Sequence, residues 1–271
     1  MTGRSVPTGL GELFGEEMRI ARKAAGLTQG ELAAKVFCVP TMISMLETAQ
    51  RTPKPDLVER IDAELGCLGR LIRLHALADN QAIPGWALEL ADAERAATSI
   101  RSFQPSFPPG LLQTPQYAEA VFGWARYLGV PDDEISRRVA RRLKRQEVLR
   151  AGKLRSYWVI IHESVLHSVI GGTAVLRDQL GYLLSVVEER IANIQVLPYE
   201  AGAFPGLAGP ISLLDVEPDG LLVHLEGPLD GRTTSDAGTI RQCTDRYDVL
   251  RSQAASVADS LTMIAARMEE L

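Results

Sequence analysis

Two short helical runs, separated by only three residues, constrain the fold of this chain more than any other feature of its sequence. The first run, T-Q-G-E-L-A-A-K-V, begins at Thr28, a favourable N-cap residue, and has Glu31 in the position of a capping-box partner. The second run, P-T-M-I-S-M-L-E, begins at Pro40, and proline is favoured as the first residue of a helix. The pattern predicts two short helices joined by a tight turn over residues 37–39.

Three further helices are predicted to close a small bundle over this pair. Apolar residues at steps of three and four mark a first helix that ends near Gly26, a suitable C′ glycine. Residues 55–65 and 68–77 supply the fourth and fifth helices. We therefore expect residues 1–78 to form a five-helix bundle, whose core includes Leu32, Val36, Ile43 and Leu46.

A second domain is predicted over residues 79–271. Its linker is expected at residues 79–85, where Asn80, Pro84 and Gly85 interrupt the helical pattern. Extended segments are predicted at 98–105, 157–163, 194–199, 211–216 and 221–227, and helices at 86–97, from Thr114, at 131–150, 173–190 and 236–267. The E-P-D-G connection after the fourth extended segment indicates an antiparallel hairpin. The predicted fold class is therefore a mostly helical α plus α/β protein, whose second domain is a mixed α/β or α+β unit.

Charge and composition exclude several classes of protein. Residues 1–78 hold 10 Lys+Arg and 9 Asp+Glu, while residues 79–271 hold 19 and 25, within a total net charge of −5. Any affinity for nucleic acid must therefore come from a local basic surface. The sequence has neither a membrane-spanning apolar run nor the plan of a signal peptide, so a cytoplasmic location is expected. Three well-separated cysteines indicate buried free thiols, with no disulfide framework, metal site or cofactor.

The runs GLTQGELAAKV, ISMLE and RTPKPDLVERI together resemble the Cro and lambda-repressor, or Xre-type, class of helix-turn-helix domains. The resemblance implies double-stranded DNA as partner, with a phosphate contact from the start of the second helix and base contacts from the third helix in the major groove. The DNA-binding residues that it implies are Thr28, Gln29, Val39, Thr41, Met42, Ser44, Met45, Arg51 and Lys54.

Several residues depart from the pattern of that class. Phe37 and Ala49 stand where glycine is common, and a left-handed backbone costs a residue other than glycine about 1–2 kcal/mol, so a reshaped turn is one expectation at Phe37. Val39, Met42 and Met45 replace polar side chains of the kind that read guanine and adenine. We expect base readout to be weaker than is usual in the class, with thymine methyl groups as the best-matched contacts.

The second domain carries a resemblance of its own. Its strings F-Q-P-S-F-P-P-G-L-L-Q-T-P-Q-Y-A, R-R-L-K-R-Q, H-E-S-V-L and V-L-P-Y are similar to the C-terminal domain of unknown function in WhiJ-like, antitoxin-like regulators of actinobacteria. This resemblance implies a small partner protein.

A basic segment over residues 137–155 admits three interpretations. If Ile135, Val139 and Leu143 form the inward stripe of a helix, most of the charged side chains lie on its other face. That face is then a solvated surface, a docking surface for an acidic partner protein, or an auxiliary contact to DNA or to an anionic ligand. The residues predicted for partner binding are Arg137, Arg138, Arg141, Arg142 and Arg145.

Catalytic and metal-binding patterns are weak. His162, Glu163 and His167 form H-E-x-x-x-H, whose two histidines are five residues apart, whereas ligation from one helix face needs a spacing of four. An apolar stripe over 250–268 is either core or a dimer seam.

The sequence as a whole predicts a homodimeric, sequence-specific transcriptional regulator whose second domain senses a partner protein or a small ligand. The alternatives are an antitoxin-like protein that sequesters a small partner with little or no DNA binding and, with no supporting motif, an enzyme.

Overall fold

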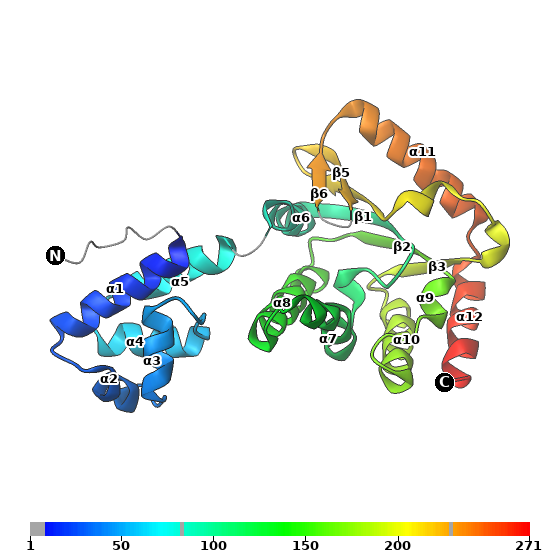
Figure 1. Cartoon of the computed structure of the whole chain (residues 1–271). Helices are drawn as coiled ribbons and strands as arrows, with labels where there is room; N and C mark the ends of the chain where they lie inside the picture. The colour runs from blue at the N-terminus through cyan, green and yellow to red at the C-terminus, as the bar shows by residue number, and fades with distance from the viewer. Residues whose placement is uncertain (1–8, 82–83, 228–229) are drawn as a thin grey trace. The chain divides into compact units, whose positions relative to one another are not determined.

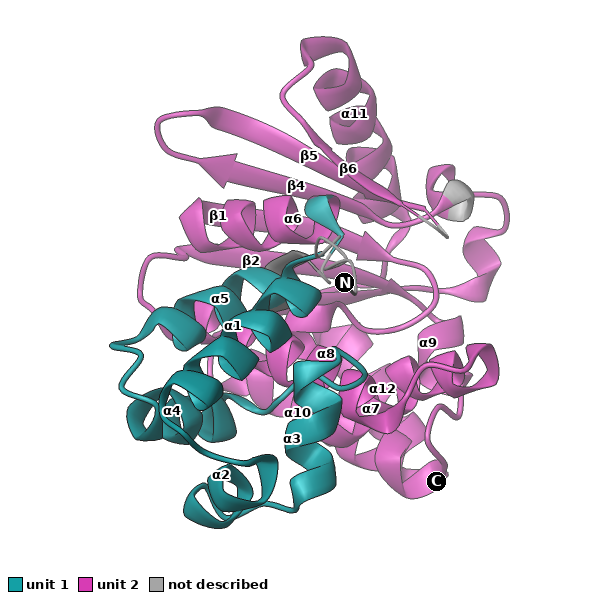
Figure 2. Cartoon of the chain, turned by 60° about the vertical axis from the view of Figure 1, so that its left-hand side comes forward, with its two compact units in different colours: residues 1–85 teal, residues 86–271 magenta. Residues whose placement is uncertain are grey.

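The chain divides into two compact units, Met1–Gly85 and Trp86–Leu271, called unit 1 and unit 2 below and coloured separately in Figure 2. The structure, a computed structural model, describes residues 9–81, 84–227 and 230–271. The predicted division at residue 78 falls inside the last helix of unit 1, which continues to Gln81. The N-terminal segment 1–8 and residues 82–83 of the predicted linker lie outside the described residues.

Unit 1 is a bundle of short helices, as expected from the spacing of its apolar residues. α1 ends at the predicted position, because Ala25 caps it and Gly26 follows with a left-handed φ of +70°. In the described part of unit 1 the helices are α1 (Leu10–Ala24), α2 (Gln29–Lys35), α3 (Pro40–Glu47), α4 (Pro55–Glu64) and α5 (Arg70–Gln81).

The core of unit 1 joins α1 to the short pair α2 and α3. Met18, Leu32 and Ile43 are completely buried in it, and Phe14 and Leu46 are almost so. The two helices α1 and α3 approach closely at Gly15, where an added Cβ would lie 2.6 Å from the carbonyl oxygen of Leu46. A glycine is therefore required at this crossing, because a side chain would push α3 away from the core.

Unit 2 is built on one mixed sheet of six strands in the order β3-β2-β1-β4-β5-β6. β1, β2 and β3 run parallel, whereas β4, β5 and β6 add antiparallel strands on the other side of β1. The strands are β1 (Ala97–Gln104), β2 (Ser156–His162), β3 (Asn193–Leu197), β4 (Ile211–Val216), β5 (Gly220–Glu226) and β6 (Gly231–Thr234).

Helices cover both faces of this sheet. Figure 1 shows α11 (Ala237–Gln253) on one face and α7 (Pro115–Gly123), α8 (Asp132–Arg145), α9 (Ser164–His167), α10 (Thr173–Glu188) and α12 (Val257–Glu269) on the other. α6 (Gly85–Ala96) precedes β1. Each face has its own apolar core: Tyr247 and Leu250 of α11 pack over Phe103 on one side, and Leu180 of α10 and Ile264 of α12 pack over Val159 on the other.

These observations confirm the predicted fold class, including the antiparallel hairpin of β4 and β5. Two details of the prediction are wrong. The predicted helix 236–267 is interrupted after Gln253, and its halves, α11 and α12, cover opposite faces of the sheet. β6 was not predicted, because its sequence G-R-T-T has no apolar alternation. In the part of the chain that the structure describes, no helix is long and apolar enough to span a membrane.

Candidate nucleic-acid interface

The start of α2 is fixed by the predicted capping box. The Thr28 hydroxyl accepts a 3.2 Å bond from the backbone N–H of Glu31, and the Glu31 carboxylate accepts a 2.7 Å bond from the backbone N–H of Thr28. These bonds also hold the pKa of Glu31 below its usual value. The first turn of α2 therefore has a defined direction, with Thr28 exposed and Gln29 half-buried.

A buried carboxylate at the end of α3 holds Gln29. Glu47 accepts a 2.8 Å bond from the Gln29 side-chain amide and bonds of 2.6 and 3.0 Å from the Arg22 guanidinium. Arg22 also donates to the carbonyl oxygen of Leu27 at 2.7 Å, and its pKa is raised by the hydrogen bond to Glu47. One amide hydrogen of Gln29 is thus committed to Glu47, which leaves the second one for a phosphate oxygen.

The turn between α2 and α3 keeps its left-handed residue despite the bulk of the side chain. Phe37 has a φ of +57°, and its successor Cys38 bonds back to Ala33 at 2.9 Å, which forms a Schellman motif. The expectation of a reshaped turn is therefore wrong. Ala49 repeats the arrangement after α3, with a φ of +53°. The Phe37 ring is 86% exposed, so it gains little packing in return for this conformation.

α3 presents an uncharged outer face. Ile43 and Leu46 are buried, whereas Thr41 and Met45 are exposed on the opposite side. Val39, the N-cap residue of α3, is 59% exposed. The other two predicted base-reading residues, Met42 and Ser44, are half-buried, and Met42 packs against the core of unit 1.

Two basic side chains follow α3 without an acidic partner. Arg51 and Lys54 are exposed, and neither forms an ion pair within the described residues. In contrast, Lys35 pairs with Glu64 at 2.7 Å and Arg60 with Asp56 at 3.1 Å. Arg51 and Lys54 therefore carry charges that no acidic side chain among the described residues neutralises.

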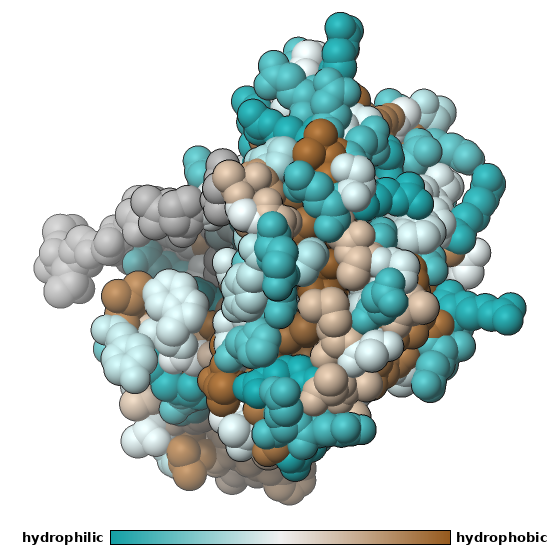
Figure 3. Space-filling model, turned by 90° about the vertical axis from the view of Figure 1, so that its right-hand side faces the viewer, coloured by the Kyte–Doolittle hydropathy of each residue, from teal (hydrophilic) through white to brown (hydrophobic). Residues whose placement is uncertain are grey.

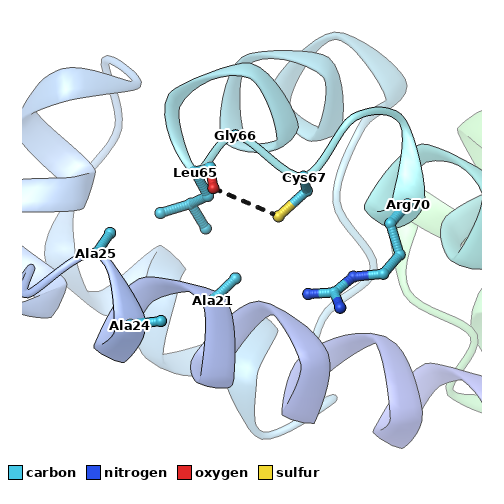
Figure 4. A pocket seen from close by; sticks show the side chains of 7 residues that line it. All are labelled: Ala21, Ala24, Ala25, Leu65, Gly66, Cys67 and Arg70. Carbon is cyan, nitrogen blue, oxygen red and sulfur yellow. Dashed lines mark hydrogen bonds between the residues drawn. The ribbon is translucent and has the colours of Figure 1, made fainter.

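An open pocket of about 430 Å³ lies elsewhere in unit 1, between the end of α1 and the turn from α4 to α5 (Figure 4). Its lining includes Ala21, Leu65, Cys67 and Arg70 and no residue of α2 or α3, so it is separate from the predicted DNA surface. The Cys67 thiol contacts the carbonyl oxygen of Leu65 at 3.8 Å, and burial raises the pKa of Cys67. All three cysteines are free thiols, but the prediction that they are buried is correct only for Cys243, because Cys38 and Cys67 are half-buried.

The basic helix of unit 2 is oriented differently from the prediction. Arg145 forms bonds of 2.7 and 2.9 Å with the carboxylate of Glu94 on α6, and Arg142 donates to the side chain of Gln113 at 2.7 Å. Burial, together with the neighbouring Arg145, lowers the pKa of Arg142 to about 10. The predicted outward orientation is therefore wrong for Arg142 and Arg145. The other three predicted arginines, Arg137, Arg138 and Arg141, are partly exposed and share the carboxylate of Glu134.

The P-P-G-L-L-Q-T segment is held by two buried amide side chains and one half-buried one, whose contacts were not predicted from the sequence. Gln113 donates to the carbonyl oxygen of Pro108 at 2.8 Å, and Gln146 donates to the carbonyl oxygen of Gln113 at 2.7 Å. Gln179 donates to Leu112 and accepts from the backbone of Thr114. Gln113 and Gln146 belong to the quoted strings, so these parts of the motif that carries the resemblance have a structural function. Arg22 and Glu47 were also missed, because no local pattern links them.

The remaining polar candidates do not form a metal site. Glu163 Oε1 and His167 Nε2 are 3.8 Å apart, while His162 bonds to Ser164. Within the described ranges no cluster of three metal-ligating side chains occurs.

Apolar side chains of unit 2 do reach the surface: Trp124, Tyr127 and Leu128, in the turn after α7, are 59%, 93% and 72% exposed. On the face drawn in Figure 3, apolar side chains likewise appear between hydrophilic ones.

Comparison with protein families agrees with this division. Residues 13–74 match the model of a helix-turn-helix domain, which makes unit 1 a DNA-binding domain of that class. Residues 88–266 match the family described as Domain of unknown function (DUF5753). Because this match covers about two thirds of the chain, the protein belongs to that family. No curated protein and no solved structure matches the chain.

Proposed function

We propose that this protein is a sequence-specific transcriptional regulator of the Xre type that acts as a homodimer on double-stranded DNA in the cytoplasm. The observation that best supports this function is the placement of Gln29. Glu47, the last residue of α3, holds it at the N-terminus of α2, and Thr41 and Met45 are exposed on the same helix α3. Phosphate contacts then come from Gln29, Arg51 and Lys54, and base contacts from the uncharged face of α3.

The proposed homodimer follows from the size of the reading surface. α3 has eight residues, and a single helix of this kind reads only one short half-site. A two-fold dimer reads two half-sites and so multiplies specificity. We place the proposed dimer interface outside α12, because Ile264 of that helix is buried in the core of its own unit.

For unit 2 we propose a sensing function of the kind expected in WhiJ-like regulators, without enzymatic activity. The sequence has none of the nucleophile, phosphate-loop or paired-carboxylate patterns that support catalysis. A small partner protein or a small-molecule effector is the proposed signal. The exposed Trp124, Tyr127 and Leu128 support a protein partner, since such side chains are frequent in interfaces.

A second candidate function is partner sequestration with little or no DNA binding, as in an antitoxin-like protein. It is supported by the apolar character of the surface around α3, where Phe37 is 86%, Val39 59% and Met45 40% exposed. Apolar side chains of this kind suit a protein partner as well as thymine methyl groups.

Fluorescence anisotropy distinguishes the two functions. The full chain is titrated with its own upstream DNA and with a scrambled duplex, between about 50 and 200 mM salt. A regulator is expected to prefer the native fragment by about 10³-fold or more. Equal and weak binding to both duplexes would favour the sequestering protein and would contradict the proposed function.

A further inference from the structure

Two arginines and two aromatic rings interleave between the sheet and α11 of unit 2. Arg101 of β1 and Trp158 of β2 are cross-strand neighbours on the face that α11 covers. The Arg101 guanidinium carbon lies 5.8 Å from the ring centre of Tyr247, and that of Arg251 lies 4.6 Å from the ring centre of Trp158. Tyr247 and Arg251 are four residues apart on α11, so both project from one side of that helix.

The charges of these arginines are not neutralised by the protein. Within the described residues, neither Arg101 nor Arg251 has a carboxylate within 4.0 Å or a hydrogen-bond partner. Asp248, three residues before Arg251 on α11, and Asp215, near Arg101 on β4, are both exposed and beyond that distance. Some other arginines of unit 2 are paired, as Arg145 is with Glu94, whereas the exposed Arg246 on α11 also has no acidic partner among the described residues. This site therefore holds two positive charges without an acidic partner, each lying over an aromatic ring.

A buried donor, the Tyr247 hydroxyl, lies within electrostatic reach of both charges. Tyr247 is completely buried, yet its hydroxyl has no hydrogen-bond partner among the described residues. The hydroxyl of Thr244, one turn earlier on α11, is likewise buried and without a partner. Burial raises the pKa of Tyr247 to about 12, so the phenol keeps its proton and can donate it to an acceptor. Buried hydroxyl groups without partners are rare in folded proteins, because leaving them unpaired costs free energy.

We propose that Arg101, Tyr247 and Arg251 bind the phosphate group of a small-molecule effector. A phosphate supplies the negative charge that the two guanidinium groups lack and accepts hydrogen bonds from all three side chains. Bound there, it ties α11 to β1. The proposal rests on the sensing function proposed for unit 2 and names the chemical class of its ligand.

Calorimetric titration of the full chain with pyrophosphate, at constant ionic strength, tests the site. Saturable binding is expected, and Arg101→Ala and Arg251→Ala should each weaken it about tenfold or more. The matched control is Arg246→Ala, which removes the same charge from an exposed position about 140° around α11 from Arg251. An equal loss in this control, or the absence of saturable binding, would overturn the proposal.

Tyr247→Phe separates binding from folding, because it removes only the unpaired hydroxyl. This variant should bind pyrophosphate several-fold more weakly, while its thermal midpoint without ligand stays equal to or above that of the wild type. Unchanged affinity would exclude Tyr247 from the site.

Two further titrations separate the sources of the anion. Citrate tests for a carboxylate ligand, and a random DNA duplex, added as competitor, tests for an auxiliary DNA contact. Tighter binding of citrate than of pyrophosphate, or displacement of pyrophosphate by the duplex, contradicts a small-molecule phosphate. None of these titrations uses the upstream DNA fragment. A negative result would therefore contradict the phosphate site of unit 2 without contradicting the DNA-binding function proposed for unit 1.

Discussion

The side-chain amide of Gln29 donates a 2.8 Å hydrogen bond to the carboxylate of Glu47, which joins the first residue of α2 to the last residue of α3. The same carboxylate accepts two hydrogen bonds from Arg22 of α1. One buried acid thereby sets the positions of three helices. The phosphate-binding residue proposed for unit 1 is part of the packing of that unit and not a free surface side chain.

Glu47→Leu is expected to destabilise unit 1 by about 3–5 kcal/mol, because it leaves the guanidinium of Arg22 buried without its partner. The double variant Arg22→Met/Glu47→Leu should recover most of this loss, since no unpaired charge remains. Scanning calorimetry of the full chain measures both. Equal losses in the single and double variants would show that the ion pair is not the source of the effect.

Substitutions in α2 and α3 should differ in their dependence on DNA sequence. Gln29→Ala is expected to weaken binding to operator and random duplex alike, because it removes a phosphate contact. Thr41→Ala should cost about 1–3 kcal/mol on the operator alone. Anisotropy titrations with both duplexes measure this difference. An equal loss of affinity for the operator and the random duplex in Thr41→Ala would contradict the assignment of α3 as the recognition helix.

Replacing the left-handed residues by glycine should stabilise unit 1. Ala49 has a φ of +53°, where glycine avoids a strain of about 1–2 kcal/mol and loses about 0.5–1 kcal/mol in conformational entropy. Ala49→Gly and Phe37→Gly are therefore expected to gain between about 0 and 1.5 kcal/mol each. Ala34→Gly, the same change at an exposed helical position of α2, should instead lose about 1 kcal/mol. Hydrogen exchange of the α2 and α3 amides measures the change in stability of all three variants. A lower stability of Ala49→Gly than of the wild type would contradict this expectation.

The stability of unit 2 should fall as the solution is acidified. His224 is 97% buried beside Arg145, and burial together with that charge lowers its pKa to about 4 from a usual 6.5. The unfolded chain therefore binds the proton first, and stability present above pH 6.5 is lost as the pH falls to about 4, by on the order of 3 kcal/mol.

Urea unfolding followed by tryptophan fluorescence measures this effect, because all three tryptophans belong to unit 2. His224→Gln removes the titrating group in both states, so its stability should depend less on pH over the same range. Identical pH profiles for the variant and the wild type would rule out His224 as the cause.

Local signals in the sequence were sufficient to predict much of unit 1. The capping box of Thr28 and Glu31, the C′ position of Gly26 and the start of α3 at Pro40 are all confirmed. Each of these depends on residues within a few positions of one another. The pairing of Arg22 with Glu47 could not be predicted in this way, because the two are 25 residues apart and neither breaks the local pattern.

The orientation of α8 shows where periodicity fails. The apolar residues Val139 and Leu143 indicated the inward face, yet both are half-buried, while Arg145 points to Glu94. A buried arginine is acceptable only where another element supplies an acid, and Glu94 is 51 residues away in the sequence. The predicted continuous helix over 236–267 is wrong for a related reason, since helical periodicity does not show where a chain crosses from one face of a sheet to the other.

The position of β1 at the centre of the sheet has a consequence for how unit 2 forms. Ser99 of β1 bonds to Ser156, 57 residues later, and Thr98 bonds to Asp215, 117 residues later. During synthesis β1 emerges long before either neighbour, so its edges stay open until β4 has left the ribosome. Unit 1, whose contacts are local, can complete first. The slow step in acquiring the native state is then the closure of long loops onto β1.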